Sequence, residues 1–149
     1  MKKNILLTLS LLLVFVLTAC GASVPATTEP AQPAQAESVS ADALFQIVKA
    51  DGSKFDVTLD AVKTLPLAQL TVEGKVQEGP KLLDILALAD ITDFSEITIT
   101  GSSAPSTLTR EQVDENTILD FSNRGTMKLA TTYIPKAEWT KDITEITVK

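Results

Sequence analysis

The sequence has no histidine, and it has one cysteine, Cys20, among its 149 residues. Imidazole and thiolate groups are the usual ligands of zinc and of most transition metals, so ordinary sites for these ions are excluded. A Ser–His–Asp triad and a Cys–His nucleophile pair are excluded for the same reason. One cysteine also cannot form an internal disulfide. We therefore expect no catalytic residue, no metal and no cofactor, and we expect that the protein is not an enzyme.

Basic residues are scarce as well. The chain has 13 Lys and Arg against 19 Asp and Glu, which gives a net charge of −6, and its only arginines are Arg110 and Arg124. Nucleic acids and anionic membrane surfaces are recognised by clustered Lys and Arg side chains. The composition therefore argues against a nucleic-acid partner and predicts an acidic, solvated surface.

The N-terminus carries the pattern of a bacterial lipoprotein signal. Lys2 and Lys3 precede an apolar run from Ile5 to Leu17, and the residues LTA stand directly before Cys20. The run is shorter than the ~20 residues that span a bilayer as a helix. A charged start, an apolar core and small residues before the cut indicate a signal peptide over residues 1–19, with Cys20 receiving the lipid. The alternatives are a retained transmembrane helix and ordinary secretory cleavage beside an incidental cysteine.

Lipidation of Cys20 predicts where the protein lies. Stable anchoring needs more than one acyl chain, and lipoproteins of this kind carry two or three on one residue. We expect an extracytoplasmic protein that contacts the cell membrane or the outer membrane through this anchor.

Residues 20–41 differ in composition from the rest of the chain. They are rich in Ala, Pro, Thr, Gln, Ser and Glu, and they contain no aromatic residue. Such a segment cannot bury enough apolar surface to offset the entropy lost on ordering. We predict a disordered tether over residues 20–41 and a folded domain over residues 42–149.

Apolar and polar residues alternate in several short stretches of this domain, as they do in half-buried strands. The dipeptide Asp51-Gly52 separates the first two stretches and predicts a hairpin. Short helices are predicted at residues 60–64 and after Thr109, which forms a capping-box spacing with Gln112. The other predicted strands lie around residues 70–72, 97–99, 118–121, 127–133 and 143–148. Short mixed strands with two or three short helices predict a single compact α+β domain.

The best helix signal runs from Pro80 to Ala89. Pro80 suits the first helical position, where its missing N–H is not needed. Nearly all the other side chains are apolar, with only Lys81 and Asp84 as a polar edge. A helix that is apolar over most of its circumference is buried. We expect this helix at the centre of the core.

A family resemblance rests on five segments in order: FDVTLDAVKTLPLAQLTVEG, GPKLLDILALADI, EITITGSS, STLTREQV and MKLATTYIPKAEWTKDITEITVK. They resemble the oxidoreductase molybdopterin-binding domain, the sulfite-oxidase-type fold, over about residues 55–149. Family members have a Leu-rich helix after a Gly-x-Pro-like start, which Gly79 and Pro80 approximate. They also have an aromatic residue shortly before an Ile-x-Val strand, matched by Trp139, Ile146 and Val148. The resemblance implies that fold.

The family's cofactor ligands have no counterpart in this sequence. Its enzymes bind molybdenum through a Cys on the loop after the strand that here ends near Glu73 and Gly74, where no Cys stands. They also hold an anionic pterin with Arg, Lys and His clusters. A fold does not imply a function, and the resemblance here implies a cofactor-free relative.

We therefore expect a non-catalytic domain that binds a small molecule or an envelope protein. The alternative is a degenerate molybdopterin oxidoreductase or an accessory subunit of a membrane redox complex. A third possibility is a purely structural envelope protein.

Four residues form the candidate ligand pocket. Gly101, Ser102 and Ser103 replace an Asp-Gly-Tyr segment that the family often has near its substrate, and the two serines with Arg124 are suited to cradle an anion. Tyr133 is suited to stack on a ligand. The alternatives are that the serines only form a turn and that Tyr133 and Trp139 are core anchors with one polar end.

Overall fold

The first two strands form the hairpin that the Asp51-Gly52 turn predicts. The computed structural model describes residues 42–149, so the predicted signal peptide, Cys20 and the predicted tether lie outside the described residues. β1 (Ala43–Val48) pairs antiparallel with β2 (Lys54–Thr58). Gly52 has a φ of 82° in the turn, and the Asp51 carboxylate accepts a bond from the Ser53 N–H at 2.8 Å.

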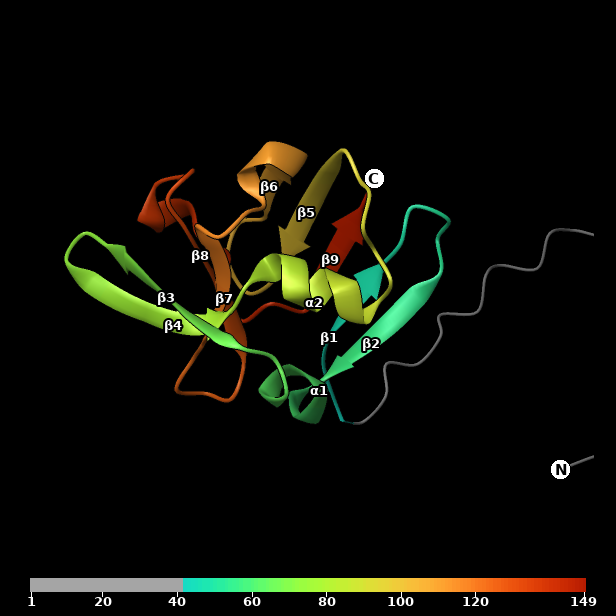
Figure 1. Cartoon of the computed structure of the whole chain (residues 1–149), viewed down its shortest axis with the longest axis horizontal. Helices are drawn as coiled ribbons and strands as arrows, with labels where there is room; N and C mark the ends of the chain where they lie inside the picture. Colours follow the sequence, from blue (N-terminus) through green and yellow to red (C-terminus); the bar gives the residue numbers. More distant parts are fainter. Residues whose placement is uncertain (1–41) are drawn as a thin grey trace, which may run out of the picture. The chain divides into compact units, whose positions relative to one another are not determined.

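The largest sheet joins the two ends of the described chain. Its order is β2-β1-β9-β5-β6, with β5 (Glu96–Thr100), β6 (Ser106–Thr109) and β9 (Glu145–Val148). The last strand, β9, lies in the middle (Figure 1), parallel to β1 and antiparallel to β5. The C-terminal strand therefore connects the β1–β2 hairpin to the β5–β6 hairpin.

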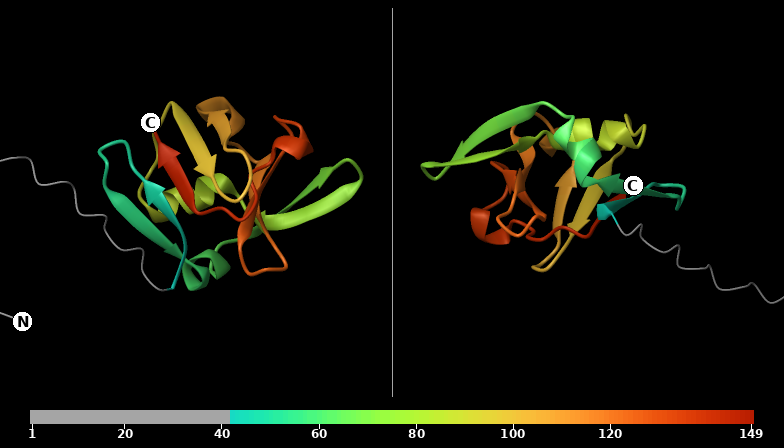
Figure 2. Two further views of the ribbon diagram at one scale, coloured as in Figure 1. Left: turned by 180° about the vertical axis from the view of Figure 1, so that it is seen from behind. Right: turned by 90° about the horizontal axis from the view of Figure 1, so that it is seen from below.

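Two smaller hairpins complete the strands. β3 (Leu67–Val72) pairs with β4 (Lys75–Pro80), and β7 (Thr117–Phe121) pairs with β8 (Met127–Thr131). A single bridge between Lys81 and Ile118 links the two hairpins. Figures 1 and 2 show the β3–β4 hairpin extending away from the five-stranded sheet. The β3–β4 turn has only two central residues, Glu73 (φ 51°) and Gly74 (φ 73°), as in a type I′ turn.

The central helix begins later than the sequence predicts. α2 spans Leu82–Leu88, with Lys81 as its N-cap. Pro80 is the last residue of β4, where it pairs with Leu67, so its assignment to the first helical position is wrong. A proline at a strand end gives up no needed ladder hydrogen bond, which explains why it is tolerated there. The predicted helix at residues 60–64 is confirmed as α1 (Leu59–Lys63), and the capping box precedes a 3-10 turn, Arg110–Gln112.

The helix α2 lies across one face of the five-stranded sheet (Figures 1 and 2). Leu82, Ile85 and Leu86 are fully buried, which confirms the predicted core role of this helix. They share one cluster with residues from the large sheet and from β7 and β8; those members include Phe45, Ile47, Ile97, Ile99, Ile146, Val148, Leu119, Met127 and Leu129. The fold is thus α+β, with strands predominating.

A second, smaller cluster lies under the β3–β4 hairpin. It consists of Leu70, Ile118, Ala130 and Trp139. Trp139 is 3% exposed, which confirms it as a core residue, whereas Tyr133 is 38% exposed. In the described part of the chain, none of the helices has the length and apolar character needed to cross a membrane.

Candidate functional site

Two of the four predicted pocket residues meet at a carboxylate that the sequence does not single out. Asp142 lies between the loop after β5 and the β7–β8 turn. Its Oδ2 accepts hydrogen bonds from Ser102 Oγ at 2.7 Å and from Arg124 Nη1 at 3.2 Å. Its Oδ1 accepts a bond from Thr126 Oγ1 at 2.6 Å. The structure therefore brings Ser102 and Arg124 together through Asp142.

These bonds favour the ionised form of Asp142. The hydrogen bond from Thr126, then that from Ser102 and the nearby Arg124 charge, lower the pKa of the Asp142 carboxyl below its ordinary value of 3.8. Asp142 has a φ of 46°, a left-handed conformation that Asp tolerates better than most residues. The ionised Asp142 carboxylate therefore links three chain segments: its own, the loop after β5 and the β7–β8 turn.

The shifted pKa predicts how stability depends on pH. Because the folded-state pKa is lowered, the Asp142 carboxylate stabilises the fold above its unfolded-state pKa, and this contribution is lost as pH falls through the folded-state pKa. Asp142→Asn should lower the free energy of unfolding at neutral pH, and its difference from wild type should shrink below about pH 4. Urea unfolding at several pH values measures this.

The matched control for this prediction is Asp93→Asn. Asp93 is exposed and makes no hydrogen bond or ion pair within residues 42–149. It should differ little from wild type at any pH. A difference between Asp142→Asn and wild type that stays constant down to pH about 3 would contradict the stabilising role of the ionised carboxylate.

Ser103 holds the neighbouring backbone. Its Oγ accepts from the Lys141 N–H at 2.9 Å and donates to the Trp139 carbonyl at 3.3 Å. Both predicted serines thus bind the segment from Trp139 to Asp142. Their hydroxyls are engaged in contacts between distant segments of the chain, which neither the anion-binding role nor the local turn-forming role predicts.

A small basic cavity lies at the turn between β7 and β8. Its volume is about 250 Å³, and Arg124, Lys128, Lys141 and Asp142 contribute its charged groups, beside Ser122 and Asn123. Lys128 Nζ pairs with Asp120 Oδ2 at 3.0 Å. Arg124 is recognisable from the sequence, whereas Lys141 is not, because only the fold places Lys141 beside a turn 17 positions earlier in the chain.

Tyr133 lies at a different place, the wall of a cavity of about 500 Å³ beside the β3–β4 turn. This hairpin cavity is lined by Thr71, Val72 and Glu73 from β3 and its turn and by residues 131–136. The Tyr133 hydroxyl donates to Asp114 Oδ2 at 2.5 Å, and this bond raises the pKa of Tyr133. Desolvation raises the pKa of Asp114, but the bonds from Tyr133 and Asn116 outweigh it, so that pKa is lowered.

The hairpin cavity carries no charge excess. Glu73 supplies one carboxylate, and Lys136 supplies one ammonium, which lies 5.7 Å from the centre of the Trp139 ring. Threonine hydroxyls and Tyr133 provide further polar groups, while Val72 and Ile134 form an apolar floor that packs on the second core cluster. Such a mixed lining suits a small polar molecule. The sequence indicates Glu73 only as the place of a missing metal ligand and does not single out Lys136, because the two residues are 63 positions apart.

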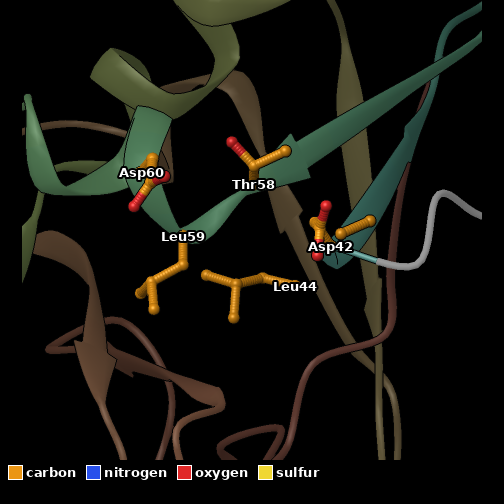
Figure 3. A pocket seen from close by; sticks show the side chains of 6 residues that line it. Asp42, Leu44, Thr58, Leu59 and Asp60 are labelled. Carbon is orange, nitrogen blue, oxygen red and sulfur yellow. The ribbon is translucent and has the colours of Figure 1, made fainter.

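A third cavity, of about 470 Å³, lies where β1, β2 and α1 meet (Figure 3). The side chains of Leu44 and Leu59 extend toward each other there, and Asp42 and Asp60 stand on either side. Its lining has two carboxylates and no basic residue. It therefore disfavours anions, in contrast to the basic cavity.

The residues present do not fit a molybdenum–pterin cofactor. The place where the family resemblance locates the metal thiolate is the two-residue turn of Glu73 and Gly74, whose Glu73 side chain is a hard oxygen donor unsuited to a soft metal. Neither arginine lines the cavity that contains this turn: Arg124 pairs with Asp142 at the β7–β8 turn, and Arg110 lies over the Phe94 ring at 5.1 Å. Within residues 42–149, no group of three or more Asp, Glu, His or Cys side chains is arranged to hold a metal ion.

Comparison with known proteins supports the fold. No protein-family model and no curated protein sequence matches the chain. Among solved structures, the chain is similar to the sulfane dehydrogenase SoxCD from Paracoccus pantotrophus, with a TM-score of 0.54 and 14% sequence identity over 70% of this chain. The chain spans 37% of the length of that SoxCD chain. At this identity the similarity shows the fold alone, and it agrees with the molybdopterin-type fold that the resemblance implies.

Proposed function

We propose that the protein is an extracytoplasmic lipoprotein, anchored through Cys20, whose domain binds a small polar molecule in the hairpin cavity without catalysing a reaction. The observation that carries the proposal is the two-residue turn at Glu73 and Gly74. It stands where the resemblance locates a metal-binding loop, and it forms part of the wall of a cavity of about 500 Å³. A volume of this size lies within the usual range of small-molecule sites, about 300–1,000 Å³.

The lining indicates the class of ligand. One carboxylate and one ammonium, from Glu73 and Lys136, do not favour net charge of either sign. The hydroxyl group of Thr132 offers a further hydrogen bond at the same cavity, while the Tyr133 hydroxyl is bound to Asp114. We therefore expect a ligand without net charge that carries several polar groups, such as a zwitterion or a polyol.

A ligand screen on the full chain tests this proposal. A molecule that binds only the native state raises the apparent stability by about 2.7 kcal/mol at one hundred times its dissociation constant. We expect at least one amino acid, polyol or sugar in a panel to raise the melting temperature. Lys136→Gln should reduce that shift, whereas Lys54→Gln, which removes an exposed lysine of β2 outside the cavity, should leave it unchanged.

Two outcomes would contradict the proposal. An absence of any shift across the panel, or a shift that Lys136→Gln leaves intact, would remove the hairpin cavity as the binding site. Mass spectrometry tests the anchor separately: an unmodified Cys20 on a chain retained inside the cell would contradict lipidation while leaving the cavity unaffected.

The second candidate function is an accessory subunit of a membrane redox complex. Similarity of fold to a chain of SoxCD, which is a sulfane dehydrogenase, favours it. Co-purification with a haem or flavin protein would support this function, and a clean monomer would weaken it. Stoichiometric molybdenum in the purified chain would instead support a degenerate oxidoreductase.

A further inference from the structure

We propose that the basic cavity at the β7–β8 turn is a binding site for a phosphate group. It is separate from the hairpin cavity and does not depend on the function proposed there. Arg124, Lys128 and Lys141 line it with a single carboxylate, that of Asp142. The volume of about 250 Å³ fits a small anion or a head group better than a large cofactor.

Positive charge gathers at this cavity although the chain as a whole is acidic. The whole sequence carries a net charge of −6, yet three cations lie around this one small cavity. The carboxylate in its wall accepts three hydrogen bonds, from Thr126, Ser102 and Arg124, so its lone pairs already have partners. Among residues 42–149, Asp142 pairs with Arg124 and Asp120 pairs with Lys128, so the charge left without an ion-pair partner at the cavity is that of the Lys141 ammonium. An anion in the cavity would supply its counter-ion.

Two of the cationic side chains at the cavity have N–H groups that can bind a ligand. Within residues 42–149, the Lys141 ammonium has neither an ion-pair nor a hydrogen-bond partner. The Arg124 side chain is 80% exposed and gives only Nη1 to Asp142. Its remaining N–H groups can bind an oxyanion in the forked geometry that guanidinium offers to phosphate. The Lys128 ammonium forms an ion pair with Asp120, so it contributes a nearby positive charge to the site rather than a free hydrogen-bond donor.

Hydrogen bonds within the fold hold the backbone of the β7–β8 turn. The Ser122 hydroxyl accepts from the Arg124 and Thr126 N–H groups at 3.3 Å each, and Gly125 closes the turn at a φ of 77°. The Asp142 carboxylate accepts bonds from both Arg124 and Ser102, which joins this turn to the loop after β5. A backbone that is ordered in advance loses less entropy on binding. The fold therefore sets the position of the Arg124 backbone at the cavity.

A phosphate group has two possible sources, a soluble phosphate compound or a phospholipid head group, and lysine labelling distinguishes them. The full chain is placed in vesicles of an uncharged glycolipid, which carries no phosphate, and is acetylated, and the modification of each lysine is read by mass spectrometry. In one arm, sodium phosphate replaces sodium chloride at constant ionic strength, so that screening does not change. In the other arm, no phosphate is added and part of the lipid is phosphatidylglycerol.

Each outcome decides the proposal. A charge-assisted hydrogen bond to phosphate should lower the labelling of Lys141 by about fivefold relative to Lys54. Protection in the first arm indicates a soluble phosphate compound, and protection only in the second indicates a lipid head group. No protection in either arm, or equal protection of Lys54, would overturn the site.

Variants test whether the protection comes from this cavity. Arg124→Gln should weaken the apparent phosphate affinity about tenfold, as expected for the loss of one charge-assisted bond. Lys63→Gln removes a positive charge at an exposed position outside the cavity, keeps Lys54 as the reference, and should leave the protection of Lys141 unchanged. Unaltered protection of Lys141 in Arg124→Gln would contradict the proposal.

Discussion

Leu86→Ala should lower the free energy of unfolding by about 2–5 kcal/mol. Leu86 lies in α2 and is 0% exposed, and it belongs to the main core cluster with residues from the large sheet and from β7 and β8. The substitution removes apolar atoms from the core and leaves a cavity that the surrounding strands can only partly fill. Because a domain of this size is stable by about 5–15 kcal/mol, the loss is a large part of the total. Urea unfolding followed by circular dichroism measures it.

Leu67→Ala is the matched control. Leu67 is the same residue type, but it lies at the start of β3 and is 54% exposed. Its loss should change the free energy of unfolding by no more than about 0.5 kcal/mol, as for most surface positions. A loss below about 0.5 kcal/mol for Leu86→Ala as well would move α2 out of the core and contradict the fold described here.

Local patterns predict most of the elements, because those elements are decided by local chemistry. Alternating apolar residues locate β1, β2 and β5, and apolar residues on both sides of a turn locate β7 and β8, whose successive residues Ile118 and Leu119 enter the two different core clusters. The Asp51-Gly52 turn is found because few other residues adopt its backbone conformation. The capping box is also local: the Thr109 N–H donates to Gln112 Oε1 at 2.9 Å. None of these elements needs information from distant parts of the chain.

The strand β4 shows where local reasoning fails. Its residues KVQEGP include Gly79 and Pro80, which have low strand propensity, and an inward-facing Gln77. Only pairing with β3 and contact with β7 define it as a strand. The sequence therefore predicts that Pro80 begins a helix, whereas it ends a strand. The placement of β9 between β1 and β5 is equally non-local, because the residue pattern of a strand does not indicate which other strands it pairs with.

The candidate site, like the fold, could be predicted from the sequence only in part. Ser102 and Arg124 are recognisable from residue type, but their common partner Asp142 lies 40 and 18 positions away from them. Tyr133 belongs to the other cavity, with Glu73 and Lys136. Residue type thus indicates which side chains can bind a ligand, and only the tertiary fold shows which of them share one cavity.

Gly79→Ala is the second substitution with a large expected effect. A Cβ added at Gly79 would stand 1.9 Å from the Leu119 carbonyl oxygen, 2.7 Å from its carbonyl carbon and 3.0 Å from Asp120 Cα. These atoms belong to the backbone of β7, so no rotamer change can make room. The β3–β4 hairpin would have to move away from β7, and that would open the second core cluster around Leu70 and Trp139. Overpacking typically costs 1–3 kcal/mol and occasionally more, and we expect about 3 kcal/mol here because backbone must yield.

Gly74 in the same hairpin separates this steric effect from a conformational one. Gly74 has a φ of 73°, and an added Cβ would meet nothing within 4 Å. Gly74→Ala should therefore cost only about 1–2 kcal/mol, through its left-handed backbone, and Gly74→Asn should recover part of that loss because Asn tolerates this conformation. No side chain should rescue position 79, since any Cβ meets the same carbonyl. Equal losses for Gly79→Ala and Gly74→Ala, or recovery at position 79 by Asn, would show that β4 and β7 are not in close backbone contact.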